Sequence, residues 1–368
     1  MTLIAGQTTS EEEFVAHVGR LTAEARAANS GRAQLVELLR DTHPVYRERG
    51  AAAVVRMRGW ILLALGQIGV TDGELIYLLE ELDNGRDPYL IATAARALRS
   101  YPTPRHAFLA VVQQALASIR YDDETVSLDT YGGDASSTPG TTASSELRAT
   151  ERWLEANAPR QHACCSESLR HDIGTSIARE SASAMQPYPP LQAMFEDQDR
   201  ERVGFAEFFR GKPTVAAFFY TRCNNPQKCS LTVTKLGRLQ KLLHARGLAS
   251  GIRTAAITYD PGFDIPHRLR SYALDRDVTF GVDHRFLRAT QLWDEVRAYF
   301  DLGVNFVGSI VNRHRVELYV LDTQGRIAIL FERLQWNEEE VLTKALELLQ
   351  RPVGTVALPA PGTPRHGG

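Results

Sequence analysis

The amino-acid sequence predicts two folded parts, an α-helical domain near the N-terminus and an α/β domain in the C-terminal half. Over residues 33–119 apolar side chains recur at helical spacing, and strand-like alternation is absent. After Pro190, short apolar runs typical of buried strands alternate with amphipathic helices. The Pro-rich residues 186–190 separate the two patterns and predict a stiff boundary. A chain of 368 residues is long enough to bury two separate cores.

The helical part contains a short internal repetition. Apolar helical runs cover residues 33–39 and 59–68, and Ala64-Leu65 recurs as Ala97-Leu98, an offset of 33 residues. Turn-forming residues border both copies. A period of this size in paired helices indicates a short α-solenoid. The run of residues 87–98 in particular resembles HEAT-type repeats, and a plain helical bundle is the alternative.

The sequence divides into four segments. Residues 1–125 are expected to form the helical HEAT-like domain. Residues 126–189 are expected to be a linker, with a flexible Gly/Ser/Thr/Pro-rich loop at 130–145, a helix near 145–156 and the pair Cys164-Cys165. Residues 190–350 form the α/β domain, and the Pro- and Gly-rich residues 351–368 are expected to be a disordered tail.

The α/β domain is predicted element by element. A continuous apolar strand at 215–220 is followed by a helix at 231–243, a strand at 252–259 and helices at 267–273 and 286–300. Strands at 316–321 and 327–331 flank the turn Asp322-Thr323-Gln324-Gly325, and a helix at 337–349 closes the domain. This order of elements is that of a thioredoxin-like α/β sandwich.

Composition and charge exclude several classes of protein. The formal net charge of -2 gives no electrostatic reason to expect a nucleic acid or an anionic membrane as partner. Four cysteines are too few for a disulfide scaffold. The N-terminus shows no secretory signal, and the most apolar window, residues 60–70, is too short to span a bilayer. We therefore expect a cytoplasmic protein without a membrane partner.

Two cysteines occupy a position suited to thiol chemistry. Cys223 and Cys229 lie between the first buried strand and the amphipathic helix that follows it. The exposed N–H groups and the dipole at a helix N-terminus stabilise a thiolate and lower its pKa. A thiolate is both a nucleophile and a ligand for soft metals. The connection therefore indicates redox chemistry or metal binding, and two unrelated cysteines are the alternative.

Five separated motifs surround these cysteines. They are Gly211-Lys212-Pro213-Thr214-Val215, the run from Phe218 to Cys223, Cys229-Ser230-Leu231-Thr232, Asp260-Pro261 with Asp264-Ile265-Pro266, and His314 five residues before Tyr319. Together they resemble the Sco/SenC copper-chaperone family of the thioredoxin superfamily, over roughly residues 190–350. The resemblance implies a copper site made of Cys223, Cys229 and His314. Two thiolates and an imidazole suit Cu(I).

The sequence departs from the family pattern in one connection. The family has three residues between its cysteines and this chain has five, residues 224–228. Asn224 to Pro226 favours a turn that brings the two sulfurs back together. Asp260 is expected either to orient this loop or to cap a helix. Cys164 and Cys165 are possible accessory thiols that exchange with Cys223 or Cys229, whereas His267 and His284 are expected at the surface.

Three functional hypotheses follow. The first is a Sco-like protein that binds Cu(I), exchanges disulfides, or both, through Cys223, Cys229 and His314, while the helical repeats recruit a protein partner. The second is an enzyme, a thiol-dependent oxidoreductase or peroxidase-like protein in which Cys223 attacks and Cys229 resolves. The third is a non-catalytic interaction adaptor. Fold alone does not decide among them.

Overall fold

The computed structural model describes residues 10–28, 30–119, 123–128, 140–159, 177–180, 187–332 and 336–350. Its N-terminal part is helical, as predicted, with a small two-stranded sheet. The helices are α1 (Glu11–Ala28), α2 (Ser30–Leu38), the 3-10 turn η1 (Pro44–Tyr46), α3 (Ala51–Ile68), α4 (Asp72–Asn84), α5 (Pro88–Leu98), α6 (Phe108–Ile119) and α7 (Ala143–Asn157). The strands are β1 (Thr125–Val126) and β2 (Thr141–Thr142).

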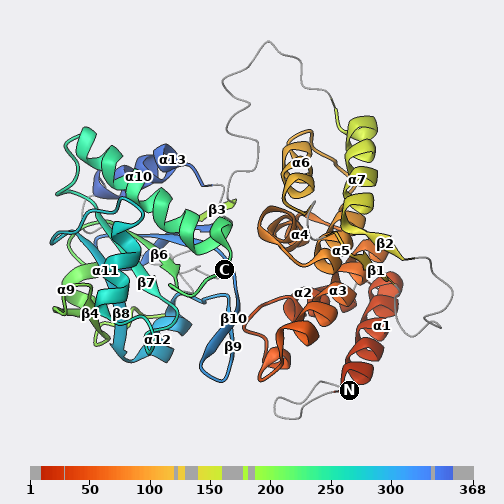
Figure 1. Cartoon of the computed structure of the whole chain (residues 1–368), viewed down its shortest axis with the longest axis horizontal. Coiled ribbons are helices and arrows are strands. Elements are labelled where there is room, and N and C mark those ends of the chain that lie inside the picture. Colours follow the sequence, from red (N-terminus) through yellow and green to blue (C-terminus); the bar gives the residue numbers. More distant parts are fainter. Residues whose placement is uncertain are drawn as a thin grey trace, which may run out of the picture.

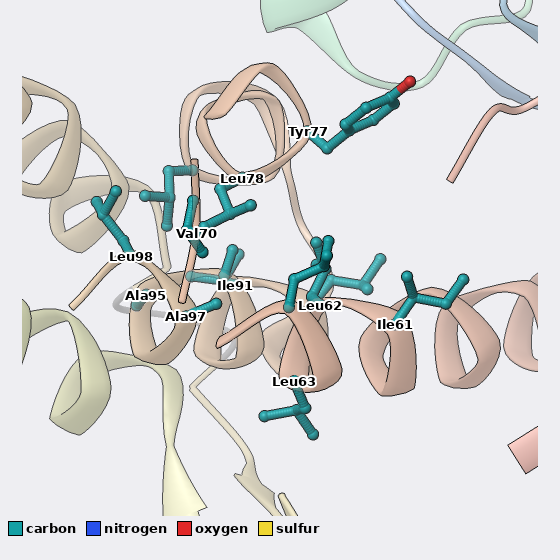
Figure 2. Close-up of a cluster of buried hydrophobic side chains, with 14 of the residues drawn as sticks. Ile61, Leu62, Leu63, Val70, Tyr77, Leu78, Ile91, Ala95, Ala97 and Leu98 are labelled. Atoms are coloured by element: carbon teal, nitrogen blue, oxygen red, sulfur yellow. The ribbon is translucent and has the colours of Figure 1, made fainter. Parts of the chain in front are cut away.

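The helices of this domain pack on one another around one apolar core. Helix α3 packs on α5, α4 on α6, and α5 on α7. Figure 2 shows Leu62, Leu78 and Ile91 from three different helices in the shared apolar core. The two copies of the Ala-Leu motif lie on the neighbouring helices α3 and α5. The helical domain is thus observed, and its assignment to the HEAT type stays a prediction.

Local signals explain where two of these helices begin. Thr71 and Glu74 form a reciprocal capping box at the start of α4. The Asp87 side chain accepts hydrogen bonds from the backbone of Tyr89 and Leu90, and Pro88 occupies the first turn of α5. Helix α7 falls within the expected linker, yet it packs on α5 and α6.

Helix α3 is longer than the apolar window seen in the sequence. By its length of 18 residues and its mean hydropathy alone, this helix could cross a membrane. Half of the helix is buried inside the protein, and it packs on α1, α2 and α5. It also carries Arg58, which is fully buried in ion pairs with Asp41 and Glu81. Its apolar character is accounted for by the core that it forms.

The C-terminal part has the thioredoxin-like α/β architecture predicted for it, built on an eight-stranded mixed sheet. The strand order is β3 (Ile177–Glu180), β12 (Ile327–Glu332), β11 (Glu317–Leu321), β6 (Thr214–Phe219), β7 (Arg253–Thr258), β8 (His284–Gln291), β4 (Met194–Asp197) and β5 (Arg202–Gly204). Strands β6, β7 and β8 run parallel to one another, and the remaining neighbours are antiparallel.

Helices cover both faces of this sheet. Along β6, Val215, Ala217 and Phe219 join one core, whereas Ala216 and Phe218 join the other, because successive strand residues point to opposite faces. The first core also takes side chains from α10 (Leu231–Ala245), α11 (Pro266–Leu274) and α13 (Glu338–Gln350). The second takes side chains from α9 (Phe205–Phe209) and α12 (Trp293–Tyr299).

One predicted helix is wrong in its first half. Residues 284–291 form strand β8, and only α12 is helical within the expected span 286–300. Phe286 and Leu287 enter opposite cores, and β8 is hydrogen-bonded to β7 on one side and β4 on the other. Pairing within the sheet therefore overrides local helical preference. His267 is exposed as expected, but His284 is buried and its Nδ1 lies 3.0 Å from Thr254 Oγ1.

A hairpin that the sequence analysis missed connects the two domains. Strands β9 (Val304–Val307) and β10 (Ile310–His314) pair antiparallel, and Figure 1 shows them between the thioredoxin-like domain and the helical domain. The Asn312 amide donates a hydrogen bond to the Arg49 carbonyl, 3.3 Å away, and the backbone of Gly308 donates to Glu48. The last residue of this hairpin is His314.

Candidate metal centre

Three separate elements bring Cys223, Cys229 and His314 together. Cys223 follows β6 by a short turn, Cys229 lies in the single helical turn η3 (Pro226–Ser230) that leads into α10, and His314 ends β10. The His314 Nε2 atom lies 3.7 Å from the Cys223 sulfur and 3.5 Å from the Cys229 sulfur. All three possible ligand atoms lie within 4.8 Å of one another. The residues singled out from the sequence thus form one cluster.

The lengthened loop between the cysteines folds back on itself. The Asn225 side chain caps η3 by accepting a hydrogen bond from the Gln227 backbone at 3.0 Å. The Cys223 sulfur lies 3.6 Å from the Asn225 carbonyl. The turn favoured by Asn224 to Pro226 is therefore present, and five intervening residues still leave the two cysteines adjacent.

The orientation of His314 leaves one ring nitrogen directed at the sulfurs. Its Nδ1 lies 2.8 Å from the backbone carbonyl of Arg315. A carbonyl can only accept a hydrogen bond, so Nδ1 carries a proton and Nε2 is the ring nitrogen that faces the sulfurs. Such a second hydrogen bond fixes the tautomer and ring orientation of many metal-binding histidines.

The site is buried on one side and accessible on the other. Cys229 is 1% exposed and His314 is 4% exposed, whereas Cys223 is only partly buried. The rings of Tyr220 and Tyr259 lie 5.4 Å and 5.2 Å from the His314 ring. Cys223 is therefore the ligand that a solvent molecule or a reactive thiol would meet first.

The two thiols differ strongly in acidity. A hydrogen bond from Cys229, together with the neighbouring His314, lowers the pKa of Cys223 to about 3. Burial raises the pKa of Cys229 well above its usual value, and the adjacent Cys223 raises it further. At neutral pH the pair therefore holds one thiolate, on Cys223, and one thiol, on Cys229. The helix-end argument from the sequence did not include this contribution from the neighbouring thiol.

Two aspartates anchor the start of the loop. Arg222 donates to Asp260 and lies 4.0 Å above the Phe263 ring. Asp264 accepts hydrogen bonds from the hydroxyl and backbone of Thr221 and from Thr258. Asp260 thus contacts the residue next to Cys223, as the loop-orienting interpretation requires.

Basic residues next to the ligands were missed by sequence reasoning. Lys228 precedes Cys229, and its Nζ donates to the His314 carbonyl at 3.0 Å. Arg313 and Arg315 flank His314 and form buried ion pairs. The run Asn312-Arg313-His314-Arg315 was a possible signal in the sequence, because two arginines close to a predicted ligand need carboxylate partners if they are buried. Cys164 and Cys165, the possible accessory thiols, lie outside the described residues.

Comparison with known proteins finds a family match in the part of the chain that contains this cluster. Residues 189–350 match the SCO1/SenC family. No curated protein matches the chain. Among solved structures, a SCO1/SenC family lipoprotein from Bacillus anthracis is 21% identical, with a TM-score of 0.37, over 45% of this chain and 99% of its own.

Two further solved structures show similar values. Yeast Sco1 is 21% identical, with a TM-score of 0.36, over 47% of this chain and 100% of its own. ScoI from Bradyrhizobium japonicum, solved with copper bound, is 19% identical, with a TM-score of 0.35, over 42% of this chain and 96% of its own. By the family match alone, residues 189–350 are similar to the SCO1/SenC family, and this range contains Cys223, Cys229 and His314.

Proposed function

We propose that this protein binds one Cu(I) ion through the sulfurs of Cys223 and Cys229 and the Nε2 of His314. The observation that carries the proposal is the convergence of these three atoms within 4.8 Å. Two thiolates and one imidazole form a soft donor set, which favours Cu(I) over hard cations. The family match over residues 189–350 supports the same ligands, since the motif resemblance implies a copper site at these positions.

The environment of the donors suits a low coordination number. Cys229 and His314 are buried, and the aromatic rings of Tyr220 and Tyr259 lie beside the histidine. These groups limit the approach of water to the inner side of the site. The Arg315 carbonyl holds His314 in the tautomer that a ligand requires.

Anaerobic titration of the reduced protein with Cu(I), in competition with a chromophoric chelator, tests the proposal. Wild-type protein should retain about one equivalent, because the three donors form a single compact site. The variants Cys223→Ser, Cys229→Ser and His314→Ala should each bind Cu(I) more weakly. The loss of affinity should exceed about 10–100-fold, which is the usual loss when only a residue that hydrogen-bonds to a metal ligand is removed.

Matched control variants test whether the loss of Cu(I) affinity is specific to the three proposed ligands. The double variant Cys164→Ser/Cys165→Ser removes the two cysteines outside the proposed ligand set, and His267→Ala removes an exposed histidine. Both should keep the wild-type affinity. Unchanged affinity in all three ligand variants would falsify the copper assignment.

Thiol–disulfide exchange is a second candidate function, favoured by the unequal acidity of the two cysteines. The partly exposed Cys223 thiolate would attack a disulfide of a partner protein and release one of its thiolates. The Cys229 thiol would then pass its proton to the released partner thiolate, and its sulfur would displace the second partner sulfur from Cys223. The products would be an intramolecular Cys223–Cys229 disulfide and a reduced partner.

Non-reducing peptide mapping after reaction with a model disulfide distinguishes the two candidates. A Cys223–Cys229 bond that forms readily and is reduced again by a dithiol supports exchange, whereas copper retention without turnover supports metal binding alone. A protein with neither property would be the adaptor. Recruitment of a partner protein by the helical domain and a cytoplasmic location stay predictions, which affinity capture and cell fractionation test.

A further inference from the structure

The helical domain contacts the lengthened loop between the cysteines directly. The Asn225 amide donates a hydrogen bond to the carbonyl of Asn84, 2.7 Å away, at the C-terminal end of α4. The guanidinium of Arg86 donates to the Asn224 carbonyl at 3.0 Å. Asn225 is 8% exposed and Asn84 is 3% exposed. The two domains therefore meet at the loop that carries the thiols.

A buried ion pair continues this contact as far as Cys229. Glu80 of α4 lies 3.5 Å from the Nζ of Lys228, the residue before Cys229. The same Nζ donates to the carbonyl of His314. The side chains of Glu80 and Lys228 are 3% and 12% exposed. One lysine therefore links the helical domain to the backbone beside two of the three proposed ligands.

Two more carboxylates of the helical domain hold the segment that carries His314. Arg313 lies 2.7 Å from Asp41 and 2.6 Å from Glu81, and Arg315 lies 3.8 Å from Asp41. Arg58 of α3 lies 3.2 Å from Asp41 and 3.4 Å from Glu81, so both carboxylates are also held by an arginine of their own domain. The residues on either side of His314 are thus anchored to a different domain.

We propose that Asp41, Glu80 and Glu81 are positioning residues that hold the Cys229 and His314 segments in the geometry of the three-ligand site. This inference rests on the proposed copper function. A ligand set held by packed neighbours loses little freedom when the metal binds, and outer partners are known to govern metal affinity through this effect. Docking of the helical domain and metal occupancy are therefore coupled, and each strengthens the other.

The test compares carboxylate-to-amide variants of the full chain. Glu80→Gln removes the partner of Lys228, and Glu81→Gln removes a partner of Arg313. Glu146→Gln is the control, because the buried Glu146 forms ion pairs with the partly exposed Arg96 and Arg99 inside the helical domain. Cu(I) affinity should fall by about 10–100-fold in the first two variants and stay unchanged in the control.

A second measurement, on the metal-free, reduced protein, reports how strongly the two ligand-bearing segments are held in place. Hydrogen exchange of peptides covering residues 221–230 and 310–316 should be faster in Glu80→Gln and Glu81→Gln than in the control. Peptides from α13 should exchange as in wild type, which distinguishes lost positioning from general unfolding. Arg86→Ala alters only an exposed side chain, so it tests the same loop if both acid variants fail to fold.

The outcomes separate this inference from the function on which it rests. Failure of wild-type protein to bind Cu(I) refutes the proposed function, and loop exchange alone then decides whether these acids position the segments. If wild type binds Cu(I), folded acid variants with unchanged affinity overturn the inference. Weaker binding together with faster loop exchange supports it.

Discussion

Replacing Asn225 by alanine removes two hydrogen bonds from the loop between the site cysteines. One is the cap that Asn225 provides to Gln227 at the start of η3, and the other is the bond across the domain boundary to the Asn84 carbonyl. Asn225→Ser separates the contributions of these two hydrogen bonds, because serine keeps a capping oxygen but is too short to reach Asn84.

The magnitudes follow from the burial of both partners. Loss of the cap costs about 1 kcal/mol of unfolding free energy. Loss of the donor to the buried Asn84 carbonyl leaves an acceptor without a partner and costs about 1–3 kcal/mol. Asn225→Ala should therefore lose about 2–4 kcal/mol in total, and Asn225→Ser only the interdomain share of about 1–3 kcal/mol.

Urea unfolding of the reduced protein, followed by circular dichroism, measures both losses as shifts of the midpoint. Asn157→Ala serves as control, because the exposed Asn157 amide bonds only within α7, to the Trp153 carbonyl. It should change stability by less than about 0.5 kcal/mol. If Asn225→Ser is as stable as wild type, the bond between the domains contributes nothing and the reasoning fails.

Three further predictions concern acidity, metal-linked stability and the core. Because its pKa is lowered, metal-free Cys223 is a thiolate at pH 6 and should react there with iodoacetamide while Cys229 does not; a rate that falls below pH 8, as for a free cysteine, would contradict this. At about 100 times the dissociation constant, free Cu(I) should raise the unfolding free energy of wild type by about 2.7 kcal/mol in calorimetry, and His314→Ala should show no such rise. Phe219→Ala, in the fully buried strand β6, should cost about 3–5 kcal/mol in urea unfolding, whereas Tyr188→Ala at an exposed position should cost almost nothing; equal losses would disprove the assigned core.

Much of the thioredoxin-like domain was predictable because its elements have strong local patterns. The apolar run of β6 and the amphipathic α10 are found close to their predicted bounds, and they frame the loop that holds Cys223 and Cys229. The sequence also predicted His314 as the third member through a resemblance of motifs. Local pattern and motif spacing therefore sufficed for the identity of the cluster.

Features that depend on distant partners were not predictable in this way. The local sequence of strand β8 favours a helix, but in the sheet the strand is paired with β4 and β7, and His284 is buried there. The contact between Asn225 and Asn84 joins residues 141 positions apart, and nothing in either local stretch encodes it. Tertiary pairing decides such cases, and a single sequence carries little trace of it.

The ion pairs across the domain boundary have a practical consequence for anyone who excises residues 189–350. Lys228 would lose Glu80, and Arg313 would lose both Asp41 and Glu81, since all three acids belong to the part removed. The fragment would carry a new cationic patch at the mouth of its thiol site. Such a patch attracts polyanions without any biological specificity, so capture experiments with the fragment would enrich nucleic acids or acidic proteins through these unpaired basic residues.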